Sequence, residues 1–209
     1  MTPVEDFHRY LAACPLVAII RGVTPDMAEK IGDALFEGGI RIIEVPLNSP
    51  EPLDSIRRLA ARLGDRALIG AGTVLDPAQV AQVAQAGGRI VVSPNTQTDV
   101  IEATAAAGLA SAPGYFTPSE AFAAIKAGAT ALKLFPAEGA SPTVLKAQKA
   151  VLPKDVPVLA VGGITTDSIS GWLEAGADGF GLGSAVYKPG QSAEDTLARA
   201  RAFVAAVKR

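Results

Sequence analysis

The sequence of 209 residues contains one cysteine, Cys14, and one histidine, His8. A single thiol cannot form an intrachain disulfide, so we expect a reducing compartment. One imidazole and one thiol cannot supply a multi-histidine zinc site either. His8 lies in an N-terminal helical pattern, where a surface position is the simplest interpretation. Acid–base chemistry is therefore expected from carboxylates, lysine or tyrosine.

Long hydrophobic runs and an excess of one charge are also missing. The longest apolar run, "LAACPLVAII", is about half the ~20 residues that a membrane span requires. The first ten residues, "MTPVEDFHRY", lack the basic region of a signal peptide. The net charge is −2, which gives no electrostatic footprint for nucleic acid or an anionic membrane. We expect a cytoplasmic protein without either partner.

What the sequence does have is a regular series of short apolar or β-branched runs, each closed by glycine, proline or a small polar residue. Stretches between them are rich in alanine and leucine, as expected of one helix after each strand of a parallel sheet. The expected strands are 16–22, 41–46, 67–73, 89–95, 109–114, 131–136, 158–163 and 179–184.

Helix-start signals support this alternation of strands and helices. Thr24-Pro25 and Asp76-Pro77 each combine an N-cap residue with proline at the first helical position. Thr117-Pro118 adds Glu120, which completes a capping box.

Eight such units predict an α/β protein, a single (β/α)8 TIM barrel over residues 1–209. Residues 3–13 are expected to add a helix that covers the bottom of the barrel. A doubly wound open sheet is the alternative, but it would usually interrupt the series with a longer crossover, and none is present.

Two charged residues interrupt apolar strands. Glu44 lies in "RIIEVP" and Lys133 in "ALKLFP", and strand alternation places both inside the barrel if the aliphatic neighbours face the helices. One interpretation is a buried ion pair that only holds the barrel together, although such pairs contribute little net stability. The favoured interpretation is functional, because a desolvated lysine becomes a neutral nucleophilic amine and a carboxylate beside it can shuttle protons.

Small residues end the last two strands, at "AVGGIT" and "GLGSAV". Gly162–Gly163 and Gly183–Ser184 each precede a helix, so backbone N–H groups there can face an anion. Phosphate sites of TIM barrels commonly use these two loops. Thr73 and Arg21, also at strand ends, could bind a second anionic group such as a carboxylate, although a salt bridge at the rim would also explain Arg21.

At these residues the sequence resembles the KDPG/KHG aldolase family nearly end to end. The motifs that carry the resemblance, in order, are "IRG", "IEVPLNSP", "IGAGTVL", "LKLFP" and "AVGGIT". The resemblance implies a class I aldolase without metal or cofactor, and typically a homotrimer. It also assigns the Schiff-base lysine to Lys133 and the general acid/base to Glu44. The implied substrate-binding positions are Arg21, Thr73, Gly162, Gly163, Gly183 and Ser184.

Departures from the gluconate-type members of the family concern the substrate. Asn48 stands where those enzymes carry an arginine, and Val161 where they carry a threonine. We expect Val161 to contact the substrate, and the substrate to be the galactonate-type epimer of a phosphorylated 2-keto-3-deoxy sugar acid, cleaved to pyruvate and D-glyceraldehyde 3-phosphate. Tyr115 and Phe116 replace smaller residues, which leaves the shape of the pocket beside the fifth strand open.

Three alternatives remain from the sequence. One is an aldolase of the gluconate type. Another is a different phosphosugar barrel, such as an isomerase or a thiamin-phosphate-synthase-like enzyme, which would share the phosphate loops but not require the lysine. The third is a barrel that binds a phosphorylated metabolite without catalysis.

Overall fold

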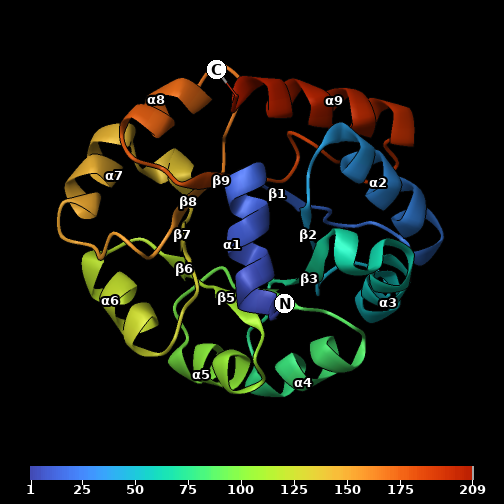
Figure 1. The fold of residues 1–209 in the computed structure, drawn as a ribbon, viewed down its shortest axis with the longest axis horizontal. Helices are drawn as coiled ribbons and strands as arrows, with labels where there is room; N and C mark the ends of the chain where they lie inside the picture. Colours follow the sequence, from blue (N-terminus) through green and yellow to red (C-terminus); the bar gives the residue numbers. More distant parts are fainter. Residues whose placement is uncertain (209) are drawn as a thin grey trace.

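The computed structural model describes residues 1–208 and shows a ring of parallel strands surrounded by helices (Figure 1). All neighbouring strands pair in parallel, in the order β5-β4-β3-β2-β1-β9-β8-β7-β6. This arrangement confirms the predicted (β/α)8 barrel. The strands are β1 (Leu16–Ile19), β2 (Ile42–Pro46), β3 (Leu68–Gly72), β4 (Ile90–Val92), β5 (Ala110–Ala112), β6 (Gly114–Tyr115), β7 (Leu132–Leu134), β8 (Val158–Val161) and β9 (Gly179–Leu182).

The fifth predicted strand consists of two pieces, β5 and β6, with Pro113 between them. Proline has no N–H to donate and interrupts the ladder at this point. Hydrogen bonds still close the ring, because Ala131 N donates to Ser111 O over 3.0 Å and Lys133 N donates to Pro113 O over 2.9 Å. The two short strands β5 and β6 therefore occupy one of the eight strand positions of the barrel.

Helices alternate with the strands as the sequence predicts. They are α1 (Pro3–Ala13), α2 (Pro25–Gly38), α3 (Pro52–Leu63), α4 (Pro77–Gln85), α5 (Thr98–Ala106), α6 (Pro118–Lys126), α7 (Pro142–Lys149), α8 (Ile169–Glu174) and α9 (Ala193–Ala206), with short 3-10 turns η1 (Gly64–Arg66) and η2 (Ala137–Gly139).

The predicted helix starts are found, with one difference in chemistry. Thr117 and Glu120 form a capping box at α6, and Asp76 forms another with Gln79 at α4. Thr24 occupies the N-cap position of α2, but its side chain makes no cap hydrogen bond. Pro25 alone starts this helix with a preset backbone angle.

Apolar side chains pack in two layers, one on each side of the sheet. Ile43 and Leu134 belong to the layer between the strands and the helices. Ile42, Ile90 and Leu159 belong to a second cluster inside the barrel. The alternation of side chains along each strand thus separates the two layers, as the sequence pattern predicts.

Helix α1 lies across one end of the barrel, at the centre of Figure 1. Phe7 and Leu11 on this helix belong to the cluster inside the barrel. The buried Asp6 forms ion pairs with Arg9 and with Arg89, which directly precedes β4. The predicted extra helix therefore closes the end of the barrel at which the strands begin.

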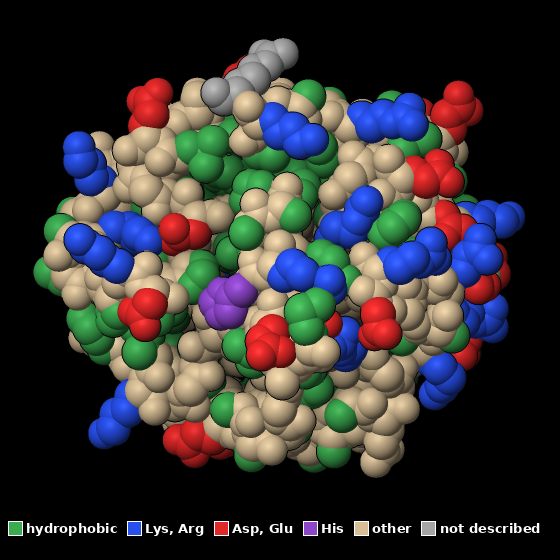
Figure 2. Space-filling model, viewed as in Figure 1, with side chains coloured by type: hydrophobic (Ala, Val, Ile, Leu, Met, Phe, Trp, Pro, Cys, Tyr) green, Lys and Arg blue, Asp and Glu red, His purple; other side chains and the backbone are tan. Residues whose placement is uncertain are grey.

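The face that includes α1 carries acidic and basic side chains interspersed, without a large area of one sign (Figure 2). None of the helices within residues 1–208 combines the length and hydrophobicity needed to cross a membrane.

Candidate active site

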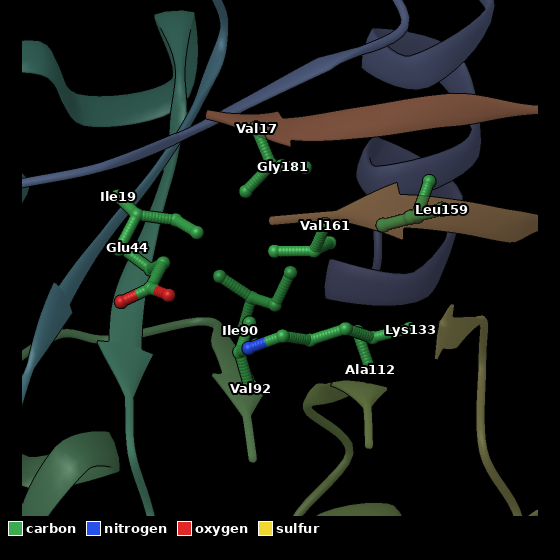
Figure 3. A pocket seen from close by; sticks show the side chains of 10 residues that line it. All are labelled: Val17, Ile19, Glu44, Ile90, Val92, Ala112, Lys133, Leu159, Val161 and Gly181. Carbon is green, nitrogen blue, oxygen red and sulfur yellow. The ribbon is translucent and has the colours of Figure 1, made fainter. Parts of the chain in front are cut away.

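Lys133 on β7 and Glu44 on β2 both point into the barrel from opposite sides (Figure 3). They line a narrow cavity, which is otherwise apolar. The exposed fraction is 7% for Lys133 and 2% for Glu44. The alternation of side chains along the two strands therefore predicted correctly that both residues point into the barrel. The lining residues are Val17, Ile19, Glu44, Ile90, Val92, Ala112, Lys133, Leu159, Val161 and Gly181.

The two buried charges do not form an ion pair. Lys133 takes part in no ion pair among residues 1–208, and Glu44 Oε2 is buried without a hydrogen-bond partner. The ammonium group of Lys133 lies 4.8 Å from the centre of the Phe135 ring. The interpretation of these residues as a structural ion pair is wrong for this arrangement.

Gly72, at the end of β3, makes room for the Glu44 carboxylate. A Cβ at position 72 would lie 1.9 Å from Glu44 Oε2 and 2.3 Å from its Cδ. Contacts this short would force the buried carboxylate to move. No local pattern in the sequence points to Gly72, because the contact joins two strands.

Burial changes the proton affinities of both groups in the direction that favours their neutral forms. Desolvation raises the pKa of Glu44 to about 7, although the positive charges of Lys133 and Arg21 oppose the rise. Desolvation also lowers the pKa of Lys133; Glu44 opposes this change and Arg21 adds to it. The site can therefore offer a neutral amine beside a carboxyl group that exchanges its proton near neutral pH.

Arg21 and Thr73 lie at the carboxyl ends of β1 and β3, close to the mouth of the barrel. Arg21 is exposed and donates a hydrogen bond from Nη1 to Asn48 Oδ1. Thr73 has a φ of 57°, a left-handed conformation that is strained for a β-branched residue and is found mainly where function maintains it. Arg21 has no carboxylate partner among residues 1–208, so no salt bridge at the rim accounts for it.

The two predicted phosphate loops follow β8 and β9, which are neighbours in the sheet. Gly162 and Gly163 have φ values of 111° and 64°, conformations that favour glycine and that direct successive backbone groups into a turn. Ser184 is exposed in the adjacent loop. The structure thus brings the two glycine-containing turns to the same side of the barrel mouth. The expectation that a helix begins at each turn is wrong, because residues 164–168 separate the first turn from α8 and residues 185–192 separate the second from α9.

Tyr115 does not enter the pocket. Its side chain belongs to the layer between the sheet and the helices, and its hydroxyl donates to Gln148 Oε1 on α7 over 3.0 Å. Phe116 is 40% exposed. Ala112 is the residue of β5 that lines the cavity. The pocket wall beside the fifth predicted strand is therefore formed by a small side chain.

Val161, at the end of β8, lines the cavity directly before the Gly162–Gly163 turn. It therefore lies in the same cavity as Lys133 and beside the predicted phosphate turn, while its contact with the substrate stays a prediction. No group of three His, Cys, Asp or Glu side chains that could hold a metal ion is present in the described part of the chain.

Comparison with known proteins agrees with this geometry. The family model of KDPG and KHG aldolases matches residues 8–201. The chain belongs to the KDPG and KHG aldolase family. A member of this family, 2-dehydro-3-deoxy-6-phosphogalactonate aldolase of Escherichia coli (strain K12), is 47% identical over 194 residues, which are 93% of this chain and 95% of that one.

Other family members show how the similarity is distributed. A solved structure described as native KDPGal superposes with a TM-score of 0.91 at 47% identity, and the match covers 93% of this chain and 94% of that chain. A 2-dehydro-3-deoxy-phosphogluconate aldolase of Pseudoalteromonas atlantica is 36% identical, and the match covers 72% of this chain and 70% of that one. The chain is more similar to the galactonate-type member than to this gluconate-type member.

Proposed function

We propose that this protein is a class I aldolase that cleaves 2-dehydro-3-deoxy-6-phosphogalactonate to pyruvate and D-glyceraldehyde 3-phosphate. The observation that carries the proposal is the buried amine of Lys133 facing the buried, unpaired carboxyl group of Glu44 inside an apolar cavity. A buried ionisable group without a partner lowers the stability of the fold, so a structural role does not account for this arrangement. Imine formation requires a neutral amine beside a group that exchanges protons, and Lys133 and Glu44 supply these two groups.

The first step is attack of the neutral Lys133 amine on the C2 ketone of the substrate. This forms a carbinolamine, and loss of its hydroxyl as water gives a protonated Schiff base. The protonated form of Glu44 can supply the proton for that departure, since its pKa of about 7 keeps a share of the group protonated near neutral pH. The lowered pKa of Lys133 provides the free amine for the attack.

The second step breaks the bond between C3 and C4. The carboxylate of Glu44, directly or through a water molecule, removes the proton of the C4 hydroxyl. The electron pair of the C3–C4 bond moves into the iminium and forms an enamine, while C4 becomes the aldehyde of D-glyceraldehyde 3-phosphate. Glu44 then returns its proton to C3, and hydrolysis of the resulting imine releases pyruvate and regenerates Lys133.

Binding is assigned to the ends of the strands around this pair. Gly162, Gly163, Gly183 and Ser184 bind the phosphate through backbone N–H groups and the serine hydroxyl, in the way that successive N–H groups of a turn bind anions. Arg21 and Thr73 bind the substrate carboxylate at the mouth. The strained backbone of Thr73 supports a functional reason for its conformation.

Preference for the galactonate epimer is assigned to Val161. Valine fills nearly the same volume as threonine but cannot hydrogen-bond a substrate hydroxyl. A site built to bond a hydroxyl discriminates more strongly than one that only accommodates it. The lost hydrogen bond is worth about 0.5–1.5 kcal/mol.

Turnover of the two C4 epimers by wild type and Val161→Thr tests the proposal. We expect wild type to favour the galactonate epimer, and Val161→Thr to raise relative kcat/KM for the gluconate epimer by up to about tenfold, as the energy of one hydrogen bond allows. Val158→Thr, on the same strand but in the layer that faces the helices, is the matched control and should leave the ratio unchanged. A wild-type preference for the gluconate epimer would replace the proposed substrate with the gluconate-type one. Substrate binding without release of pyruvate would favour the non-catalytic barrel.

We further propose that residues 1–209 form one domain, and that the enzyme works as a homotrimer in the cytoplasm. Light scattering of the purified protein tests the trimer, because a monomeric mass would contradict it.

A further inference from the structure

Glu138 lies against the Gly162–Gly163 turn, although it comes from a different loop. It belongs to η2, the 3-10 turn that follows β7, and β7 and β8 are neighbours in the sheet (Figure 1). A Cβ added to Gly162 would lie 2.3 Å from Glu138 Oε2, and one added to Gly163 would lie 2.5 Å from Glu138 Cγ. The acidic side chain therefore fills the space that a side chain at either glycine would need.

The charge of Glu138 has no partner in the described part of the chain. Glu138 is exposed and takes part in no ion pair among residues 1–208. The two loops assigned to the phosphate, residues 161–166 and 183–187, contain no lysine or arginine. Lys188 directly follows the second loop, but the side chain that contacts the Gly162–Gly163 turn is the carboxylate of Glu138. A phosphate held at this turn by backbone N–H groups would thus lie close to a negative charge.

We propose that Glu138 weakens the binding of phosphate at the Gly162–Gly163 turn and so favours release of the phosphorylated product. This inference rests on the proposed function, because it concerns the same phosphate site. Like charges a few ångströms apart repel, and water at this exposed position reduces the repulsion without removing it. The substrate and D-glyceraldehyde 3-phosphate carry the same phosphate, so the carboxylate disfavours retention of both. Binding energy common to substrate and product does not lower the chemical barrier, and its reduction favours release of the phosphorylated product.

The test compares Glu138→Gln with Glu138→Ala, which separate charge from packing. Inhibition by inorganic phosphate and kcat/KM for the phosphorylated substrate and its unphosphorylated analogue are measured at low and high salt. We expect both variants to lower the inhibition constant of inorganic phosphate and the KM of the phosphorylated substrate by about three- to tenfold at low salt, and less at high salt. Values for the unphosphorylated analogue should not change. Glu174→Gln, an exposed residue at the far end of α8, is the matched control and should behave as wild type.

Three outcomes would overturn the proposal. If Glu138→Gln leaves phosphate inhibition unchanged while wild type still prefers the phosphorylated substrate, the charge plays no part and the phosphate site stands. If Glu138→Ala instead raises KM for the phosphorylated substrate, Glu138 supports the turn by packing. Wild type that is indifferent to phosphate, in both substrate and inhibitor, would contradict the phosphate site itself and this proposal with it.

Discussion

The barrel buries a carboxylate near each of its two ends, and their surroundings differ. Asp6 on α1 and Glu44 on β2 are both 2% exposed. Asp6 Oδ2 lies 2.7 Å from Arg89 Nη2, and Asp6 Oδ1 is bonded to Arg9. Glu44 Oε2 has no hydrogen-bond partner, and desolvation raises its pKa to about 7.

The difference separates a carboxylate that holds the fold from one that is available for chemistry. An ionised group inside a protein is costly unless it is paired and hydrogen-bonded. Asp6 meets that condition and joins α1 to the strand end at Arg89. Glu44 does not meet it, and Gly72 leaves the space that its carboxylate occupies. Burial therefore identifies neither role by itself, whereas burial without a partner points to function.

The largest expected effect is on turnover in Glu44→Gln. Glutamine keeps the shape of the side chain but cannot exchange a proton, so kcat should fall by about 10²–10⁴. The free energy of unfolding at alkaline pH should not fall, because the variant removes an unpaired buried charge. Steady-state kinetics and urea unfolding on the same preparation check both parts. Near-normal turnover with a large loss of stability would mean that Glu44 holds the fold after all.

Asp6→Asn is the counterpart at the other end of the barrel. It leaves the guanidinium of Arg89, which is only 23% exposed, without its closer partner. Removal of one member of a buried pair lowers the free energy of unfolding by about 3–5 kcal/mol, while kcat/KM of the folded protein should stay close to wild type. Urea unfolding and kinetics at a temperature well below the midpoint measure this. Loss of activity in fully folded Asp6→Asn would contradict the claim that Asp6 supports only the fold.

The pH dependence of stability gives a smaller effect at Glu44. Its pKa is about 7 in the folded state against 4.5 as the ordinary value, so the folded state binds the proton more tightly. The resulting stability is fully present below pH 4.5 and is lost as the pH rises through about 7. Relative to Glu44→Gln, wild type should lose at most about 3 kcal/mol over this range. Urea unfolding at several pH values would contradict this if the difference between the two proteins stayed constant.

The sequence predicted the barrel because its signals are local. Strand spacing, capping boxes and proline positions each concern residues a few positions apart. Alternation along single strands was enough to place Glu44 and Lys133 inside. Side chains that alternate along the chain from Ala112, which faces the cavity, would also have placed Tyr115 on the side of the helices. The split of the fifth strand at Pro113 was missed, although the proline itself was a signal.

Features that depend on contacts between distant segments could not be predicted. The space that Gly72 leaves for Glu44 joins β3 to β2, and the position of Glu138 on the Gly162–Gly163 turn joins the loops after β7 and β8. The left-handed backbone of Thr73 contradicts the preference of a β-branched residue, so local propensity predicts the opposite. The structure was needed to see that Lys133 and Glu44 face each other without pairing.

The most direct test of the central claim is to trap the covalent intermediate on Lys133. The protein is incubated with pyruvate and sodium borohydride, which reduces an imine to a stable secondary amine, and is then digested and mapped by mass spectrometry. We expect one reduced pyruvyl group on the peptide that contains Lys133, its persistence in Lys149→Ala, and its absence in Lys133→Ala. Labelling that survives in Lys133→Ala, or wild type that turns over substrate without ever being labelled, would contradict the claim that the buried amine of β7 is the nucleophile.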